Sequence, residues 1–295
     1  MRSNSLKSTF SIGGLIVVEN KKYVDHDMIK EQTAIIENNT VDLVMFMGQS
    51  NMAGRGVASE APVVPKGYGY EFKAISNPTK LYEIVEPFGV NENNSFGINE
   101  PEMKTGSLVS AFTIAYYNDV KVPIVGVSAS KGGSSINSWQ PNGSYLKDAI
   151  DRFTKAENYL LNKDYKIRKK FMVWCQGETD GDNNMSGAEY KTKLQAMIET
   201  MFANGVEECF LICIGNHRDL PNQYSSIIKA QTDFCESYEK AILVSTRFSG
   251  MASQGLMKDP FHYRQAAYNT VGTEAGKNTA SYILNNKKPE EMQHS

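Results

Sequence analysis

The sequence is poor in the residues and patterns that hold metals and nucleotides. Its 295 residues include four cysteines and four histidines, with no Cys-x-x-Cys pair, no His-Glu-x-x-His and no cysteine–histidine cluster at zinc spacing. It also lacks a Gly-x-Gly-x-x-Gly after an expected strand and a phosphate loop ending in Gly-Lys-Ser/Thr. We therefore expect chemistry that needs no cofactor and no metal ion. We expect the cysteines, Cys175, Cys209, Cys213 and Cys235, to be buried, reduced thiols.

The sequence also has no large excess of charge of either sign and few long apolar runs. The 31 Lys and Arg residues nearly balance 33 Asp and Glu residues, which argues against a protein that binds nucleic acid or a membrane surface through basic patches. The apolar run at residues 12–18 is interrupted by two glycines, and no run is long enough to span a bilayer. We expect a globular, cytoplasmic protein with neither nucleic acid nor membrane as a partner. Its oligomeric state stays open.

Short, β-rich apolar runs recur along the chain and alternate with segments of helical spacing. The clearest helical face comprises Tyr190, Leu194, Met197, Ile198 and Met201, with Ser186 and Glu189 ahead of it at capping-box spacing. Apolar strands that alternate with amphipathic helices are typical of a parallel sheet covered on both faces. We predict an α/β, three-layer α/β/α, doubly wound fold of about five strands. The expected strands are 41–47, 122–127, 171–175, 210–214 and 241–245, and further helical faces lie at 108–116, 146–161 and 263–284.

Two regions do not fit this alternation. Residues 1–40 precede the first expected strand, and we treat them as an N-terminal extension. Residues 57–104 show no clear period and are rich in glycine, proline, asparagine and aromatic residues. A long irregular stretch within a domain is more often functional than accidental. We therefore expect one domain over residues 41–290, decorated by loops at 57–104.

Clusters of polar residues directly follow three of the expected strands, at 48–56, 128–135 and 176–181, and a fourth cluster at 259–262 precedes the last helix. In an open α/β sheet the active crevice lies beyond the carboxyl ends of the strands. All four clusters are therefore expected at one edge of the sheet.

Ser50 and His262 are the residues in these clusters that suit nucleophilic chemistry. Ser50 lies near glycines at a strand-to-helix turn, where its N–H could face a developing negative charge, although an ordinary N-cap serine shows the same pattern. Asp259 stands three residues before His262 and could accept the Nδ1 proton, although Asp-Pro also suits a helix N-cap. The absence of a Gly-x-Ser-x-Gly elbow excludes the common α/β-hydrolase arrangement.

Taken in order, the four clusters resemble a known family. They read Gly48-Gln49-Ser50-Asn51-Met52, Gly132-Gly133-Ser134, Gln176-Gly177-Glu178-Thr179-Asp180 and Asp259-x-x-His262. These blocks resemble those of the SGNH (GDSL-like) hydrolase superfamily and, more narrowly, its sialate O-acetylesterase / acetylxylan esterase branch, carbohydrate esterase family 6. The resemblance covers residues 41–285. It implies a flavodoxin-like fold and a serine esterase that hydrolyses O-acetyl groups of carbohydrates, such as acetylated xylo-oligosaccharide, sialic acid or a related glycan.

The resemblance also implies roles for particular residues. Ser50 would be the nucleophile, His262 the general base and Asp259 the carboxylate that orients the imidazole. The oxyanion hole would comprise the Ser50 N–H, the Gly132 N–H and the Gln176 side chain.

Some assignments stay open at this stage. Gly133 is an alternative to Gly132 as the backbone donor. Glu178 stands about where the wider superfamily carries an asparagine donor, and an ionised glutamate cannot donate. Glu178 is therefore an alternative carboxylate for orienting His262.

The alcohol side of the substrate is bulky and needs a broad polar rim. Trp139 and the aromatic residues of 57–104 are candidates for stacking on sugar rings. Further candidates for support or substrate binding are Asn51, Arg55, Asn91, Asn93 and Asn94. A non-catalytic carbohydrate-binding protein and an esterase for non-sugar esters are the alternative functions. The Ser50, Asp259 and His262 set disfavours the first, and the lack of a long apolar lid segment disfavours the second.

Overall fold

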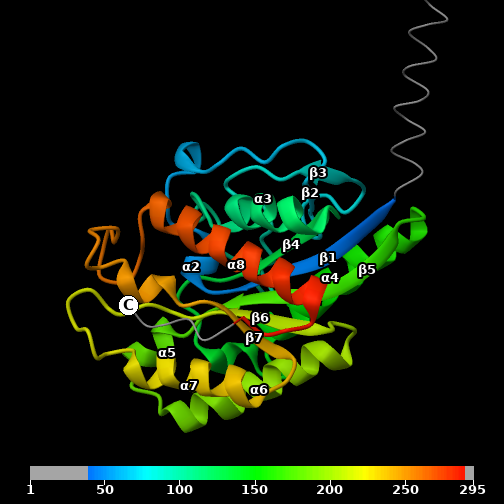
Figure 1. Cartoon of the computed structure of the whole chain (residues 1–295). Helices are drawn as coiled ribbons and strands as arrows, with labels where there is room; N and C mark the ends of the chain where they lie inside the picture. Colours follow the sequence, from blue (N-terminus) through cyan, green and yellow to red (C-terminus); the bar gives the residue numbers. More distant parts are fainter. Residues whose placement is uncertain (1–38, 290–295) are drawn as a thin grey trace, which may run out of the picture. The chain divides into compact units, whose positions relative to one another are not determined.

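The computed structural model describes residues 39–289, so the predicted N-terminal extension lies outside the described residues apart from its last two positions. The centre is a seven-stranded sheet in the order β3-β2-β4-β1-β5-β6-β7 (Figure 1). Five of its strands coincide with the expected ones: β1 (Thr40–Gly48), β4 (Ile124–Ser130), β5 (Lys166–Cys175), β6 (Glu208–Ile212) and β7 (Ala241–Ser245). The predicted fold class is confirmed, with two strands more than expected.

The two additional strands come from the region without a clear period. β2 (Gly69–Phe72) pairs parallel to β4, and β3 (Leu81–Glu83) pairs antiparallel to β2. Strands of four and three residues are too short to show an alternating pattern in the sequence. Without them, the remaining strands follow the flavodoxin-like order, in which the chain reverses direction across the sheet between β1 and β5. The crevice beyond this reversal point is where such folds bind ligands.

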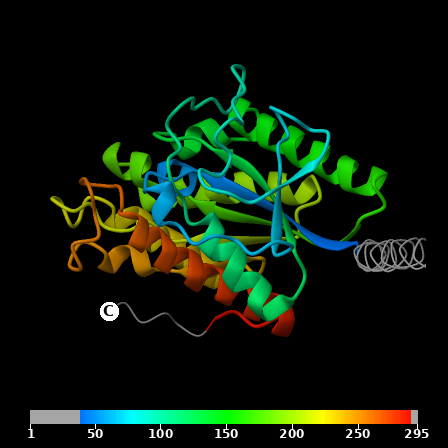
Figure 2. The same cartoon turned by 90° about the horizontal axis from the view of Figure 1, so that it is seen from above.

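Alternating side chains of the central strands feed two separate cores. In β1, Leu43, Met45 and Met47 face one core, and Val44 and Phe46 face the other. The first core is covered by α4 (Ser144–Asn162), α6 (Gly187–Ala203) and α7 (Ser225–Ser237), and the second by α3 (Val109–Val120) and α8 (Gln265–Asn285). Figure 1 shows α3 and α8 on the side of the sheet opposite α6 and α7, and Figure 2 shows α4 opposite α8.

The best-defined helix of the sequence forms as expected. Ser186 caps α6, and its hydroxyl accepts a hydrogen bond from the Glu189 N–H at 3.2 Å. The Glu189 side chain does not complete the capping box, because it pairs with Lys193 one turn later. By contrast, α7 has no counterpart among the predicted helices. All four cysteines are buried and free, as expected. No helix within residues 39–289 has the length and apolar character needed to cross a membrane.

Candidate active site

The first polar cluster turns sharply out of β1 into the short helix α2 (Ser50–Ala53). Gly48 ends the strand with φ +142°, and a Cβ there would fall on the carbonyl oxygen of Cys175 in β5. Only glycine allows this close approach, and the Gln49 N–H donates to the same carbonyl at 3.0 Å. Ser50, at 5% exposure, is the first residue of α2. Within residues 39–289, its hydroxyl and its N–H have no hydrogen-bond partner.

Asn51 joins the Ser50 turn to two other predicted clusters. Its wholly buried side chain donates from Nδ2 to Glu178 Oε1 at 2.5 Å and to the Phe261 carbonyl at 3.0 Å, and its Oδ1 accepts from the Tyr268 hydroxyl at 2.7 Å. Glu178 begins α5 (Glu178–Asp182) after β5, and Phe261 precedes His262. The clusters after β1 and β5 and the one before α8 therefore meet at one edge of the sheet.

Asp259 and His262 form the contact that the spacing suggested. Asp259 Oδ2 lies 2.8 Å from His262 Nδ1, and Asp259 Oδ1 accepts the backbone N–H groups of Phe261 at 3.1 Å and His262 at 2.7 Å. An Nδ1–H that donates to this carboxylate leaves Nε2 as a free acceptor. The alternative role of Asp259 as a helix N-cap is not observed, since α8 begins at Gln265 after Arg264.

The electrostatics of this pair suit a neutral base. Burial lowers the pKa of His262 below its ordinary value, Asp259 opposes this shift, and the nearby charges of Arg55 and Lys258 add to it. For Asp259, burial acts to raise the pKa, but the hydrogen bonds from Phe261 and His262 outweigh it and lower the pKa. At pH 7 the imidazole is therefore neutral beside an ionised carboxylate.

The structure brings Ser50 and His262 to the same edge without joining them directly. Among the described residues, no hydrogen bond links the Ser50 hydroxyl to the imidazole. Their connection runs through the neighbouring residues, from Asn51 to the Phe261 carbonyl. In enzymes without substrate, catalytic hydrogen bonds are often long and shorten when the substrate binds.

Glu178 contacts Asn51 and not the imidazole. It is buried, and its Oε2 has no partner within residues 39–289. Burial raises its pKa to about 7, while the hydrogen bond from Asn51 acts in the opposite direction. Of the two carboxylates considered for orienting His262, Asp259 is therefore the one in contact with the ring.

The expectation that Gln176 donates to an oxyanion needs correction. Gln176 is wholly buried, and its Nε2 lies 2.8 Å from the Ser134 carbonyl, 2.5 Å from Asp180 Oδ2 and 3.2 Å from Gln49 Oε1. An amide nitrogen has only two hydrogens to donate. Its donors are thus used inside the protein, where they hold the loop after β4 against the turns after β1 and β5.

The two glycines after β4 differ in whether their N–H groups are available. The Gly132 N–H donates to Glu100 Oε1 at 2.9 Å, and the same oxygen pairs with the buried guanidinium of Arg55. Gly133 is exposed with φ +67°, and its N–H has no partner in the part of the chain that the structure describes. Gly133 is thus the more available donor, and Arg55, expected to bind substrate, is instead paired inside the protein.

Trp139 does not form a sugar-binding face. Its ring is wholly buried, its Nε1 donates to Ser134 Oγ at 3.0 Å, and it packs edge-on against Trp174. The expectation is wrong because the sequence gives the residue type and not its burial. An exposed aromatic does lie beside the imidazole: Phe261 is 38% exposed, with its ring centroid 4.6 Å from that of His262.

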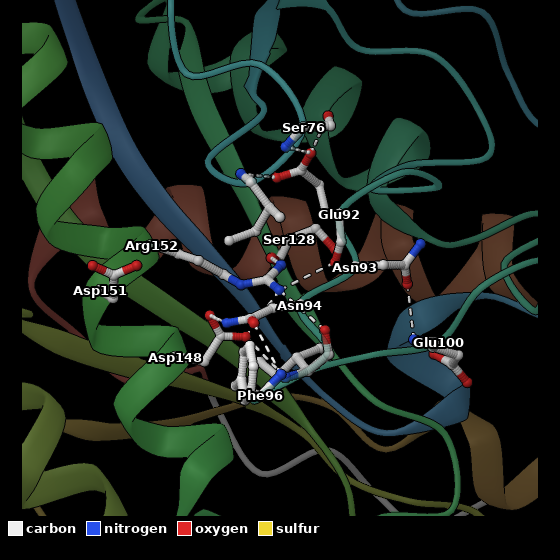
Figure 3. Close-up of polar contacts among 12 residues, drawn as sticks. Ser76, Glu92, Asn93, Asn94, Phe96, Glu100, Ser128, Asp148, Asp151 and Arg152 are labelled. Carbon is white, nitrogen blue, oxygen red and sulfur yellow. Dashed lines mark hydrogen bonds and ion pairs between the residues drawn. The ribbon is translucent and has the colours of Figure 1, made fainter.

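A buried polar network supports the loop that carries Glu100, and the sequence analysis missed it. Figure 3 shows the Arg152 guanidinium of α4 pointing into this loop, with Asp148 beside it. Arg152 is wholly buried and donates to the carbonyls of Ser128 at 2.7 Å, Glu92 at 3.1 Å and Ile98 at 3.2 Å. Its Nη2 also lies 2.9 Å from Asp148 Oδ2. One feature of the sequence could have indicated this network: Asp148 and Arg152 carry opposite charges four residues apart, on the apolar face of an expected helix.

The asparagines expected to bind sugar hydroxyls are partly engaged in the same loop. Asn93 Oδ1 accepts the Glu100 N–H at 2.8 Å, and Asn94 Nδ2 donates to Asp148 Oδ1 at 2.8 Å (Figure 3). Asn91 is exposed. Within residues 39–289, no group of three His, Cys, Asp or Glu side chains is placed to hold a metal ion.

Comparison with protein families identifies the chain. Residues 40–281 match the family described as carbohydrate esterase, sialic acid-specific acetylesterase. The chain belongs to this acetylesterase family. The family resemblance found in the sequence is thereby confirmed, and membership supports hydrolysis of carboxylic esters.

Solved structures agree on the fold of this acetylesterase family member. A protein from Arabidopsis thaliana superposes with a TM-score of 0.62 at 18% identity, covering 84% of this chain and 99% of that one. NanS gives 0.60 at 13% identity, covering 85% and 99%. A carbohydrate acetylesterase from Xanthomonas citri gives 0.52 at 14% identity, covering 83% and 57%. No curated protein sequence matches the chain.

Proposed function

We propose that this chain is a serine esterase that removes O-acetyl groups from carbohydrates through an acetyl-enzyme on Ser50. Family membership supports ester hydrolysis. The observation that carries the assignment is the 2.8 Å contact between Asp259 and His262 Nδ1, at the edge where Ser50 leaves β1 with a free hydroxyl. Nucleophilic acyl transfer requires a neutral imidazole with a free Nε2 and a serine hydroxyl free to react, and this edge of the sheet carries both.

In the proposed reaction, His262 Nε2 takes the hydroxyl proton of Ser50 while Oγ bonds to the acetyl carbon. The tetrahedral intermediate collapses, the bond to the sugar oxygen breaks, and His262 returns the proton to that oxygen. Water then attacks the acetyl-enzyme and gives a proton to His262. The second tetrahedral intermediate breaks its bond to Ser50 Oγ, His262 returns the proton to that oxygen, and acetate leaves. Asp259 keeps the imidazole in the required tautomer and stabilises its protonated form.

The oxyanion of the intermediate needs hydrogen-bond donors that no other group uses. The Ser50 N–H and the Gly133 N–H meet this condition, whereas the Gln176 amide and the Gly132 N–H are bonded inside the protein. We therefore assign the first two as the donors. Removing one such donor typically costs about 2.7–4 kcal/mol of transition-state stabilisation.

The sugar would lie over the exposed rim beside His262. Phe261 offers an aromatic face there, in the place for which the sequence suggested Trp139. Aromatic rings are large, rigid contact surfaces that combine well with polar neighbours. The leaving alcohol would thus stack beside the base that must protonate it.

We further propose that residues 41–290 act as one esterase domain. The family match over residues 40–281 supports this boundary, because it leaves the N-terminal extension outside. The loops at 57–104 belong to the domain and bring Glu100 to the site.

The function is tested by measuring acetate release. We expect the purified protein to hydrolyse an activated aryl acetate and to release acetate from a panel of acetylated xylo-oligosaccharides and O-acetylated sialic acid. Activity on the aryl ester with none on any sugar would favour the alternative of an esterase for non-sugar esters. A folded protein that releases acetate from nothing in the panel would contradict the proposal.

A further inference from the structure

We propose that Asn51 is a positioning residue that keeps the His262 imidazole where it can take the proton of the Ser50 hydroxyl. This inference rests on the proposed function. Asn51 is wholly buried and cannot meet the substrate. It directly follows Ser50 in a helix of four residues, so the two side chains are carried by adjacent backbone positions. A shift of one is therefore passed on to the other.

Every polar group of the Asn51 side chain has a partner from a different part of the fold. Nδ2 donates to Glu178 at the start of α5 and to the Phe261 carbonyl, and Oδ1 accepts from Tyr268 on α8. Exchanging the amide oxygen and nitrogen would set an acceptor against two acceptors, so the contacts themselves fix the orientation of the amide.

The bond to Phe261 reaches the peptide group that precedes His262. That planar group contains the Phe261 carbonyl and the His262 N–H. Asn51 holds the carbonyl at 3.0 Å, and Asp259 holds the N–H at 2.7 Å. Asp259 also contacts the ring at Nδ1. The backbone of the general base is thus held from both sides, by the residue next to the nucleophile and by the residue that orients the ring.

A second link between the same two segments provides a matched control. Lys258 Nζ donates to the Arg55 carbonyl at 2.5 Å. It joins the segment after β1 to the segment before α8, as Asn51 does, but the Lys258 ammonium group does not bond to the peptide group that precedes His262. The backbone N–H of Lys258, which donates to the His262 carbonyl at 3.0 Å, is kept when the side chain is changed. If Asn51 only fastened the segments together, removing either link would have similar consequences.

The experiment measures how fast a fluorophosphonate probe labels Ser50, because this reaction requires an activated serine but not the natural ester. The main variant is Asn51→Asp combined with Glu178→Gln. It keeps Tyr268 bonded to residue 51, lets the residue 178 amide donate to the new carboxylate and moves the carboxyl group from residue 178 to residue 51. At the Phe261 carbonyl the donor is replaced by an oxygen that can only accept, so this contact is broken. Controls are Glu178→Gln alone and Lys258→Met, all measured at pH 8, where His262 is neutral.

We expect the double variant to be labelled about 100-fold more slowly than wild type, because a misplacement of about 1 Å in an active site can have this effect. Its kcat on an aryl acetate should fall in parallel, with KM within about threefold. Both controls should differ from wild type by less than about tenfold. Labelling of the folded double variant at the wild-type rate would overturn the role of Asn51 and leave the esterase proposal standing. An unlabelled Ser50 in the wild type would instead overturn the esterase proposal itself.

Discussion

Two buried polar clusters of this molecule differ in how completely their groups are paired. Around Arg152, the guanidinium donates to three backbone carbonyls and to Asp148, and only its Nε has no partner among the described residues. At the carboxyl edge of β1 and β5, the Ser50 hydroxyl and N–H are unpartnered within the same range, as is one oxygen of buried Glu178.

The difference separates a cluster that stabilises the fold from one whose groups are available for a reaction. Buried polar groups are normally hydrogen-bonded, and among the described residues each cluster leaves one buried side-chain atom unpaired, Arg152 Nε in the first and Glu178 Oε2 in the second. The Ser50 hydroxyl differs from both, because it lacks a protein partner without being enclosed. The Arg152 cluster stabilises a loop, and the loop in turn carries Glu100 to Gly132 through Asn93. The edge with unpaired groups is where a substrate oxygen can find donors and where a proton can be taken. Removing a group should therefore affect stability in the first cluster and turnover in the second.

The largest expected effect comes from Ser50→Ala. We expect kcat on an aryl acetate to fall by up to ~10⁶-fold, the scale seen when a catalytic triad loses its nucleophile. The free energy of unfolding should change by less than about 1 kcal/mol, because the hydroxyl has no partner to lose. Steady-state kinetics and urea unfolding of the same preparation measure both quantities. Retention of wild-type turnover would remove the nucleophile assignment.

Asp259→Asn should have the next largest effect. The amide can no longer hold the imidazole in the Nδ1–H tautomer, and the corresponding change in a serine protease lowers kcat by ~10⁴. Glu178→Gln should lower kcat by less than about tenfold, because Glu178 contacts Asn51 and not the ring. The reverse order of effects would show that Glu178, and not Asp259, serves the imidazole.

Arg152→Met tests the scaffold cluster. Removing one partner of a buried ion pair typically costs about 3–5 kcal/mol, because the other charge stays buried without compensation. Urea unfolding should show this loss, while kcat per folded molecule should fall by less than about tenfold. A large loss of kcat without a loss of stability would abolish the distinction between the two clusters.

The pH dependence of the site should follow His262. Burial lowers the pKa of this residue below its ordinary value, so the imidazole stays deprotonated to a lower pH than an exposed histidine does. We expect kcat/KM to be level near pH 7 and to fall about tenfold per pH unit once the pH is below that pKa. Since Asp259 acts to raise the pKa of His262, the half-maximal pH should move lower in the residual activity of Asp259→Asn.

The sheet and the location of the site could be predicted from the sequence because both depend on local order. Continuous apolar runs mark buried parallel strands, and the polar residues that end those strands must share an edge. The contact of Asp259 with His262 spans three residues and could be predicted for the same reason. The short strands β2 and β3 could not, since β2 forms by pairing with β4 and β3 by pairing with β2.

The roles of Gln176, Trp139 and Arg152 depend on burial and on partners far along the chain. Gln176 has a donor type suited to an oxyanion, but Ser134 and Asp180 take its hydrogens. Trp139 has the ring of a sugar platform and lies in the core. Arg152 carries a charge that is rarely buried, and three of its four acceptors are backbone carbonyls, which leave no trace in the amino-acid sequence.

The central claim is that Ser50 and His262 act together to form an acetyl-enzyme, and the most direct measurement is acid-quenched mass spectrometry of the protein mixed with an aryl acetate. The account predicts an acetyl group on the peptide that contains Ser50 within the first turnover, and its absence in His262→Ala. Acetylation at another residue, or acetylation of Ser50 at an equal rate in His262→Ala, would contradict it.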